Sequence, residues 1–228
     1  ENENKEIKII THPAALKPQY IKNIGSFGCP YTKEELQSLG ARFAFSKKPI
    51  WISDDIIVSG EVPMINDYEK VGEGFYREFG ENYKNSKEII EDEQKLGFKT
   101  NGKKFVEDRK LIDDQAIFLK TKLGLIIVLG CAHRGTINTI HYAQKITNMD
   151  KVYMIIGGTH TANASEYRMK STINEFKKIN VRKIGVSHCT GLVSGCKLAN
   201  ELEDEVFFHN NAGSVINFEN KRLKVNEF

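Results

Sequence analysis

Three histidines of this sequence share one local pattern, an apolar run followed by a turn of small residues. They are His133 in VLGCAHRG, His160 in IIGGTH and His188 in GVSHCTG. Such apolar runs predict buried strands, and ligands of α/β sheets bind where strands end and loops begin. Neutral imidazole is a common ligand of zinc and iron. The pattern therefore predicts that the three side chains converge on a metal site.

A catalytic metal site keeps an open position for water, whose pKa falls toward about 7 on the metal. We therefore expect His133, His160 and His188 to bind a divalent metal, zinc first and iron or manganese as alternatives, with His160 and His188 also acting in catalysis. One histidine at a strand end is usually a structural residue, whereas three in succession favour a site. Three further histidines are expected to be structural or superficial: His12, His141 and His209.

Two other chemistries remain open. Cys131 and Cys189 stand beside these histidines and could be soft metal ligands, although buried cysteines are usually inert. A cysteine nucleophile paired with histidine could be Cys189 with His188 or Cys131 with His133, and the first pair is disfavoured because neighbours on a strand point to opposite faces. Phosphate binding at 157–158 or at Gly191 suits a helix start, but no full phosphate-loop motif is present, which favours a contact with a substrate oxyanion.

The second half of the chain alternates apolar runs with amphipathic segments, which predicts βα units around a buried sheet. The predicted strands are 116–121, 125–129, 152–156, 183–187 and 206–209, the predicted helices 136–147, 165–179 and 192–202, and a hairpin of 214–218 with 222–225 follows.

The first half is less regular. Strands are predicted at 5–11, 41–45 and 50–58, and helices at 14–23 and 32–39. Thr32 and Glu35 form the capping-box pattern of a helix start, and Gly40 supplies the stop. Residues 66–112 are rich in charge and glycine, which predicts an insertion in a single domain of residues 1–228. This insertion is expected to be a solvated loop with one helix near 86–96, or a lid or dimer contact.

Composition favours an ordinary globular protein. Apolar residues make up 40% and charged residues 28% of the 228 residues. The 33 basic and 30 acidic side chains are interspersed, which argues against a nucleic-acid partner. The longest apolar stretch, 123–129, is far shorter than the ~20 residues of a membrane helix. Four cysteines without a paired framework, and a polar start without a secretory signal, favour the cytoplasm.

The ordered motifs resemble a branch of the metallo-β-lactamase superfamily that carries Gly-Cys-Ser-His and His-Cys-Thr-Gly and includes dihydropterin-linked ribofuranosyl-aminobenzene-phosphate synthases and metal-dependent hydrolases. GCAH, ending at His133, matches the first motif with Ala132 in place of Ser, and HCTG, starting at His188, matches the second. GGTH, ending at His160, is similar to a Gly-Gly-Phe-His motif, and VSGEVP (58–63) to a Thr-Gly-Glu-Ile-Pro strand end. The resemblance implies an αββα sandwich of the α/β class and a metal ligand at His188.

The superfamily's His-x-His-x-Asp-His motif, which belongs to the first half of the fold, does not occur in these 228 residues. We therefore expect a truncated, C-terminal portion of the fold, completed by a complementing N-terminal segment or by a homo-oligomer. The resemblance implies a hydrolase in which metal-activated water attacks a phosphate ester or a pterin-like phosphorylated small molecule. The alternative is a non-catalytic binding or assembly module on the same scaffold.

Overall fold

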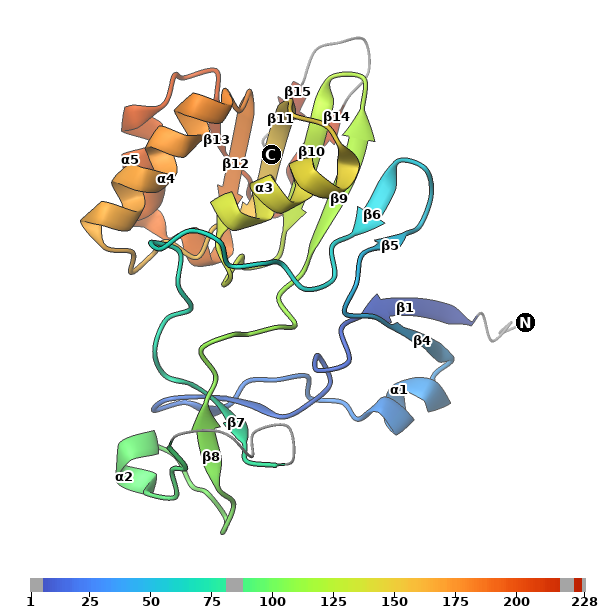
Figure 1. Ribbon diagram of the computed structural model, residues 1–228, viewed down its shortest axis with the longest axis vertical. Helices are drawn as coiled ribbons and strands as arrows, with labels where there is room; N and C mark the ends of the chain where they lie inside the picture. Colours follow the sequence, from blue (N-terminus) through green and yellow to red (C-terminus); the bar gives the residue numbers. More distant parts are fainter. Residues whose placement is uncertain (1–5, 81–87, 218–223, 227–228) are drawn as a thin grey trace. The chain divides into compact units, whose positions relative to one another are not determined.

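The computed structural model describes residues 6–80, 88–217 and 224–226 (Figure 1). The chain forms two compact units, one of residues 1–47 and 71–113 and the other of residues 48–70 and 114–228. The candidate site belongs to the second unit.

The second unit is built on a seven-stranded sheet in the order β13-β12-β11-β10-β9-β6-β5. Strands β10 to β13 are mutually parallel, while β9 runs antiparallel to both β10 and β6. The strands are β5 (Ile50–Trp51), β6 (Ile56–Val58), β9 (Ala116–Thr121), β10 (Gly124–Leu129), β11 (Val152–Gly158), β12 (Lys183–Ser187) and β13 (Phe207–His209).

Three helices connect the parallel strands: α3 (Thr136–Thr147), α4 (Glu166–Ile179) and α5 (Leu192–Glu201). Each new strand is added on the same side of the previous one, so right-handed crossovers place all three helices on one face of the sheet (Figure 1). The core lies between this face and the helices. Phe118, Ile127 and Ile155 supply it from the strands, and Ile140 and Phe176 from the helices.

Most predicted elements of this unit are confirmed, because their apolar runs are bounded by polar turns. Strands 116–121 and 183–187 and helix 136–147 have the predicted bounds, and the others differ by one or two residues. The predicted strand 50–58 is instead a hairpin of β5 and β6, because Ser53, Asp54 and Asp55 form its turn. The closing hairpin pairs β14 (Val215–Asn217) with β15 (Lys224–Asn226), and residues 218, 222 and 223 of its predicted strands lie outside the described residues.

The first unit contains short strands and a small core of its own. Parallel β1 (Ile7–Thr11) and β4 (Ala41–Phe45) form one sheet, and β3 (Gly25–Ser26), β2 (Gln19–Ile21), β7 (Phe75–Glu78) and β8 (Phe105–Glu107) form a second, in that order. Helix α1 (Lys33–Ser38) begins at the predicted capping box of Thr32 and Glu35. In β7, Arg77 forms buried ion pairs with Asp108 and Asp113, which follow β8 in the chain.

Two predictions for the first unit are wrong. The helix predicted at 14–23 is absent, because Pro18 interrupts it and Gln19–Ile21 pair with β7 as a strand. The predicted insertion is not simply a solvated loop with one helix. It contributes β7, helix α2 (Glu93–Leu96) and β8, which bury Tyr76, Leu96 and Phe105 in one cluster. Whether residues 1–228 count as a single domain stays a prediction.

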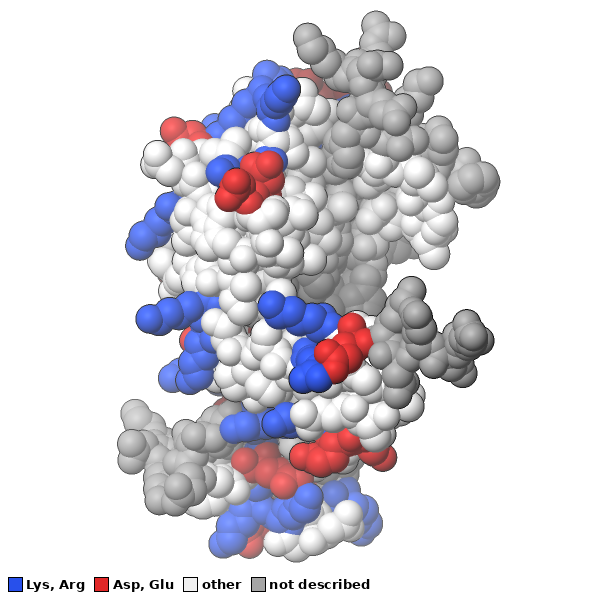
Figure 2. Space-filling view, turned by 90° about the vertical axis from the view of Figure 1, so that its right-hand side faces the viewer, with Lys and Arg blue, Asp and Glu red and all other residues white. Residues whose placement is uncertain are grey.

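Charge on the visible surface is mixed. Figure 2 shows basic and acidic side chains interspersed on the displayed face, as expected from the near balance of the sequence. Within the described residues, no helix is both long enough and apolar enough to cross a bilayer.

Candidate functional site

The site lies at one edge of the seven-stranded sheet. Strands β10, β11 and β12 are parallel and end at Leu129, Gly158 and Ser187, so the loops that follow them emerge at the same edge. In these loops Ala132, His160 and His188 have φ angles of 48°, 48° and 51°. This left-handed conformation costs non-glycine residues on the order of 1–3 kcal/mol each and persists where the surrounding structure holds it, often at functional sites.

His133 and His160 face each other. Their ring centroids lie 4.1 Å apart, with the ring planes inclined by 51°. Burial lowers the pKa of His160 below its usual value, and the positive charge of Arg168 lowers it further, while Asp114 acts in the opposite direction. His160 is therefore a neutral imidazole at neutral pH and can bind a metal or accept a proton.

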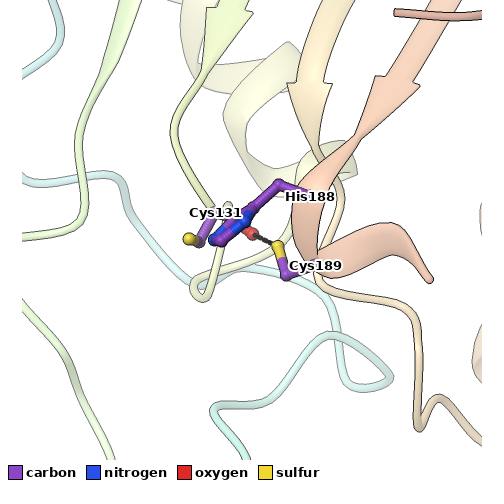
Figure 3. A group of neighbouring side chains, drawn as sticks. All are labelled: Cys131, His188 and Cys189. Carbon is purple, nitrogen blue, oxygen red and sulfur yellow. Dashed lines mark hydrogen bonds between the residues drawn. The ribbon is translucent and has the colours of Figure 1, made fainter. Parts of the chain in front are cut away.

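His188 lies close to two cysteines. The Sγ atoms of Cys131 and Cys189 and a ring nitrogen of His188 all lie within 4.8 Å of one another. Figure 3 shows the three side chains gathered between the loops that follow β10 and β12. Donors around one tetrahedral zinc ion, at bond lengths of about 2.0–2.3 Å, lie about 3.3–3.8 Å apart. These three donors therefore fit a single thiophilic metal ion after a small adjustment.

The two thiols are electrostatically unequal. A hydrogen bond between them raises the pKa of Cys131 to about 12 and lowers the pKa of Cys189 to about 7, because the Cys131 thiol donates to the Cys189 thiolate. When protonated, Cys189 Sγ donates to the carbonyl oxygen of Cys131, 3.4 Å away (Figure 3). Cys189 thus reaches the thiolate form, which is the form that binds metals, near neutral pH.

Gly158 provides the space for Cys189. A Cβ atom at position 158 would lie 2.6 Å from Cys189 Sγ and 2.7 Å from the carbonyl oxygen of Gly130. The Gly158 amide also donates to that oxygen over 3.0 Å and joins the first loop to the second. The Gly-Gly pair of the sequence therefore allows a close approach of backbone and sulfur.

Three threonines join the second loop to the third. Thr159 Oγ1 lies 2.8 Å from Thr161 Oγ1 and 2.9 Å from Thr190 Oγ1, and all three residues are buried. The Thr159 amide also donates to Thr190 Oγ1 over 3.1 Å. This network fixes His160 and His188 relative to each other through their sequence neighbours.

Glu69 stabilises the start of α3, directly after the loop that carries His133. Its carboxylate accepts hydrogen bonds from the amides of Ile137 (2.9 Å) and Asn138 (2.8 Å) at the start of α3, where Gly135 provides no side-chain cap. Gly135 has φ = 103°, and a Cβ there would lie 2.2 Å from Glu69 Oε2. The helix start is thus capped by a residue 68 positions away from Ile137.

Asp114 approaches the site from β9. Its Oδ2 accepts from the Arg134 amide over 2.9 Å, and its charge acts on both His160 and Cys189. Because β9 is antiparallel to β10, with Ala116 opposite Leu129, the residues before β9 lie at the same sheet edge as those after β10. The predicted pairing of strands 116–121 and 125–129 is the signal in the sequence that points to Asp114.

A cavity of about 350 Å³ opens beside His188. His188, Gly191, Leu192, His209 and Asn210 are among the residues that line it. Its volume is in the range of small-molecule pockets. His209, which we expected to be structural or superficial, is exposed and lines this cavity.

The structure thus brings the three predicted histidines to one sheet edge, and their assigned roles stay predictions. It adds Cys131 and Cys189 as donors that we had considered less suitable than the histidines. Capping by Glu69 and the charge of Arg168, which is close enough to influence His160, were not foreseen, because both depend on contacts between distant segments.

A search of family models finds no match. The chain is 30% identical to 7,8-dihydropterin-6-methyl-4-(β-D-ribofuranosyl)-aminobenzene-5′-phosphate synthase of Methanocaldococcus jannaschii over 228 positions, covering 94% of this chain and 67% of the relative. It is 27% identical to an uncharacterised protein of the same organism, covering 95% and 70%. The crystal structure of a metal-dependent hydrolase of the β-lactamase superfamily superimposes with a TM-score of 0.70 at 19% identity, covering 92% of this chain and 70% of that one. The predicted fold class is confirmed by the likeness to that hydrolase, and the chain belongs to the family of the M. jannaschii synthase.

Proposed function

We propose that this protein is a metal-dependent hydrolase that cleaves a phosphate ester or a pterin-like phosphorylated small molecule. The observation that supports this most directly is the set of donors from Cys131, His188 and Cys189, whose ligand atoms lie within 4.8 Å of one another. The His133 and His160 rings lie in the adjoining loops and supply further imidazole nitrogens.

A divalent metal bound by these residues would lower the pKa of a water ligand toward about 7 and so supply hydroxide at neutral pH. His133, His160 and His188 are its proposed ligands, and Cys131 and Cys189 are additional donors. Thiolate and imidazole together favour zinc over magnesium or calcium, while iron and manganese remain alternatives.

The protein side chains would position the substrate and move protons. His160, kept neutral by burial and by Arg168, can accept a proton from the attacking water if it is not itself a metal ligand. The cavity beside His188 has room for a small substrate. At its wall Leu192 is 75% exposed and offers an apolar surface to a ring system.

The substrate class is supported by the relative from M. jannaschii. The name of that synthase describes a product with a dihydropterin, an aminobenzene and a ribofuranosyl 5′-phosphate. We infer that the present protein binds a molecule with one or more of these parts, and that the phosphate is the most strongly recognised because it is charged.

Metal binding tests the site directly. After incubation with equimolar zinc and desalting, elemental mass spectrometry should find about one zinc per wild-type chain. His188→Ala should retain much less zinc, because loss of a ligand weakens zinc binding more than about tenfold. His141→Ala is the matched control, because His141 lies on α3 with Glu175 and Gln144 as its neighbours. Wild-type protein that retains no metal would overturn the proposal and favour the non-catalytic module.

Cobalt substitution identifies the donors independently of activity. Thiolate ligation gives intense charge-transfer absorption, which Cys131→Ser and Cys189→Ser should each reduce. Cys29→Ser and Cys196→Ser provide matched controls at exposed cysteines and should leave the spectrum unchanged. Release of phosphate from ribose 5-phosphate or a pterin-linked phosphate ester then tests hydrolysis, which should require bound metal and disappear in His188→Ala.

A further inference from the structure

Arg168 is a buried cation without a direct counterion. It lies in the first turn of α4 and is only 9% exposed. Within the described part of the chain, its buried Nε and Nη2 atoms have no hydrogen-bond partner, and its guanidinium forms no ion pair. A buried charge of this kind costs several kcal/mol unless another group compensates it.

The carboxylate whose charge acts on Arg168 is already engaged. Glu69 acts electrostatically on Arg168, but its oxygens accept from the amides of Ile137 and Asn138 and from Asn66 Nδ2. Glu69 therefore partly balances the charge of Arg168 but accepts no hydrogen bond from its Nε or Nη2. These two donors remain available to a ligand.

The guanidinium is electrostatically coupled to the candidate site. Its charge acts on His160 and on Cys189, which belong to the loops after β11 and β12. One turn further along α4, the buried hydroxyl of Thr172 also has no hydrogen-bond partner within the described residues. Residues four apart lie on the same face of a helix, so this face presents a cation and a hydroxyl, both with unused hydrogen-bonding capacity.

We propose that Arg168 binds the phosphate group of the substrate next to His160. The identification of this anion as the substrate's phosphate rests on the proposed function, whereas the presence of an anion site rests on Arg168 alone. Arginine suits this role because its planar guanidinium can donate two parallel hydrogen bonds to a phosphate, which lysine cannot do. Binding would also give the buried charge the counterion that it lacks.

Calorimetry tests the proposal without any catalytic step. It measures the binding of inorganic phosphate, ribose 5-phosphate and ribose to the metal-free protein. We expect ribose 5-phosphate to bind and ribose to bind much more weakly. Arg168→Met should weaken ribose 5-phosphate binding about ten- to a hundredfold, the range for a hydrogen bond to a charged group, and Arg168→Lys should restore it only in part. Arg182→Met, at an exposed arginine just beyond α4, is the matched control and should bind as the wild type does.

Thermal unfolding separates binding from folding. Ribose 5-phosphate should raise the midpoint for the wild type and for Arg182→Met, and not for Arg168→Met. Without ligand, Arg168→Met should unfold at the same or a higher temperature than the wild type, because an apolar side chain replaces an uncompensated charge. Equal ribose 5-phosphate affinity of Arg168→Met and wild type would overturn the proposal, as would equal binding of ribose and ribose 5-phosphate.

The outcome is distinguishable from that for the metal site. Arg168→Met should retain the metal content of the wild type, and His188→Ala should retain phosphate binding in the metal-free state. Loss of metal binding in every protein would contradict the proposed function and leave the anion site intact. Loss of zinc from Arg168→Met would instead show that Arg168 supports the metal loops, and would overturn its assignment as an anion ligand.

Discussion

The cap that Glu69 places on α3 can be tested by removing one acceptor oxygen. In Glu69→Gln the side chain keeps one carbonyl oxygen, while its amide group becomes a donor. Either the Ile137 or the Asn138 amide then loses its acceptor in a region where Glu69 is only 1% exposed. We expect this exchange to destabilise the second unit and to loosen the loop of His133.

The expected magnitude follows from two contributions. A buried amide without an acceptor costs about 1–3 kcal/mol. Loss of the negative charge at the helix N-terminus adds about 0.3–1 kcal/mol. The sum is about 1.3–4 kcal/mol, and Glu69→Ala, which leaves both amides without an acceptor, should cost more. With a urea dependence of about 2 kcal/mol per molar, the unfolding midpoint of Glu69→Gln should fall by about 0.7–2 M.

Urea unfolding followed by tryptophan fluorescence reports on the correct unit, because the single tryptophan of the chain, Trp51, lies in β5. Circular dichroism provides a second probe of the same transition. Glu203→Gln, at an exposed carboxylate of the same unit, is the control and should leave the midpoint unchanged. A midpoint for Glu69→Gln within about 0.3 M of the wild type would refute the assignment of Glu69 as the essential cap.

Two further results are expected. Gly158→Ala should destabilise the protein by about 1–3 kcal/mol in urea unfolding and alter cobalt absorption, because its Cβ would collide with Cys189 Sγ. Gly130→Ala is the control and should do neither, because a Cβ there would have its nearest neighbour 3.9 Å away. Equal effects of the two substitutions would contradict this explanation. Burial and a hydrogen bond to Glu78 raise the pKa of Tyr20 to about 12, so its stabilising contribution is complete below pH 10 and is lost between pH 10 and 12. The difference in alkaline absorbance between wild type and Tyr20→Phe should show this late titration, and a midpoint near 10 would refute it.

The sequence by itself determined the βα layer and the loops that carry the histidines. A short apolar run bounded by turn residues, such as 125–129, indicates a buried strand, and the helix after Gly135 follows from its amphipathic pattern. Parallel strands then require that His133, His160 and His188 emerge at one edge. The ordered motifs around them also indicated the superfamily, because motif order reflects the topology of the sheet.

Local patterns were insufficient in the first unit. Short strands such as Gln19–Ile21 and Phe75–Glu78 are stable only because they pair with each other, 56 positions apart in the register of Tyr20 with Tyr76. A helical pattern interrupted by Pro18, and a charged segment with scattered aromatics, gave no indication of this pairing. Such strands depend on tertiary contacts, which override local propensity.

Only the tertiary structure decided which side chains meet within the site. It placed His188 with two cysteines, Glu69 beneath α3, and the charge of Arg168 near His160. The sequence determines at which edge a loop emerges, because strand direction follows from local pattern and crossover rules. The direction of each side chain depends on left-handed turns such as those at His160 and His188, and on close approaches such as that of Cys189 to Gly158, which only the packed fold imposes.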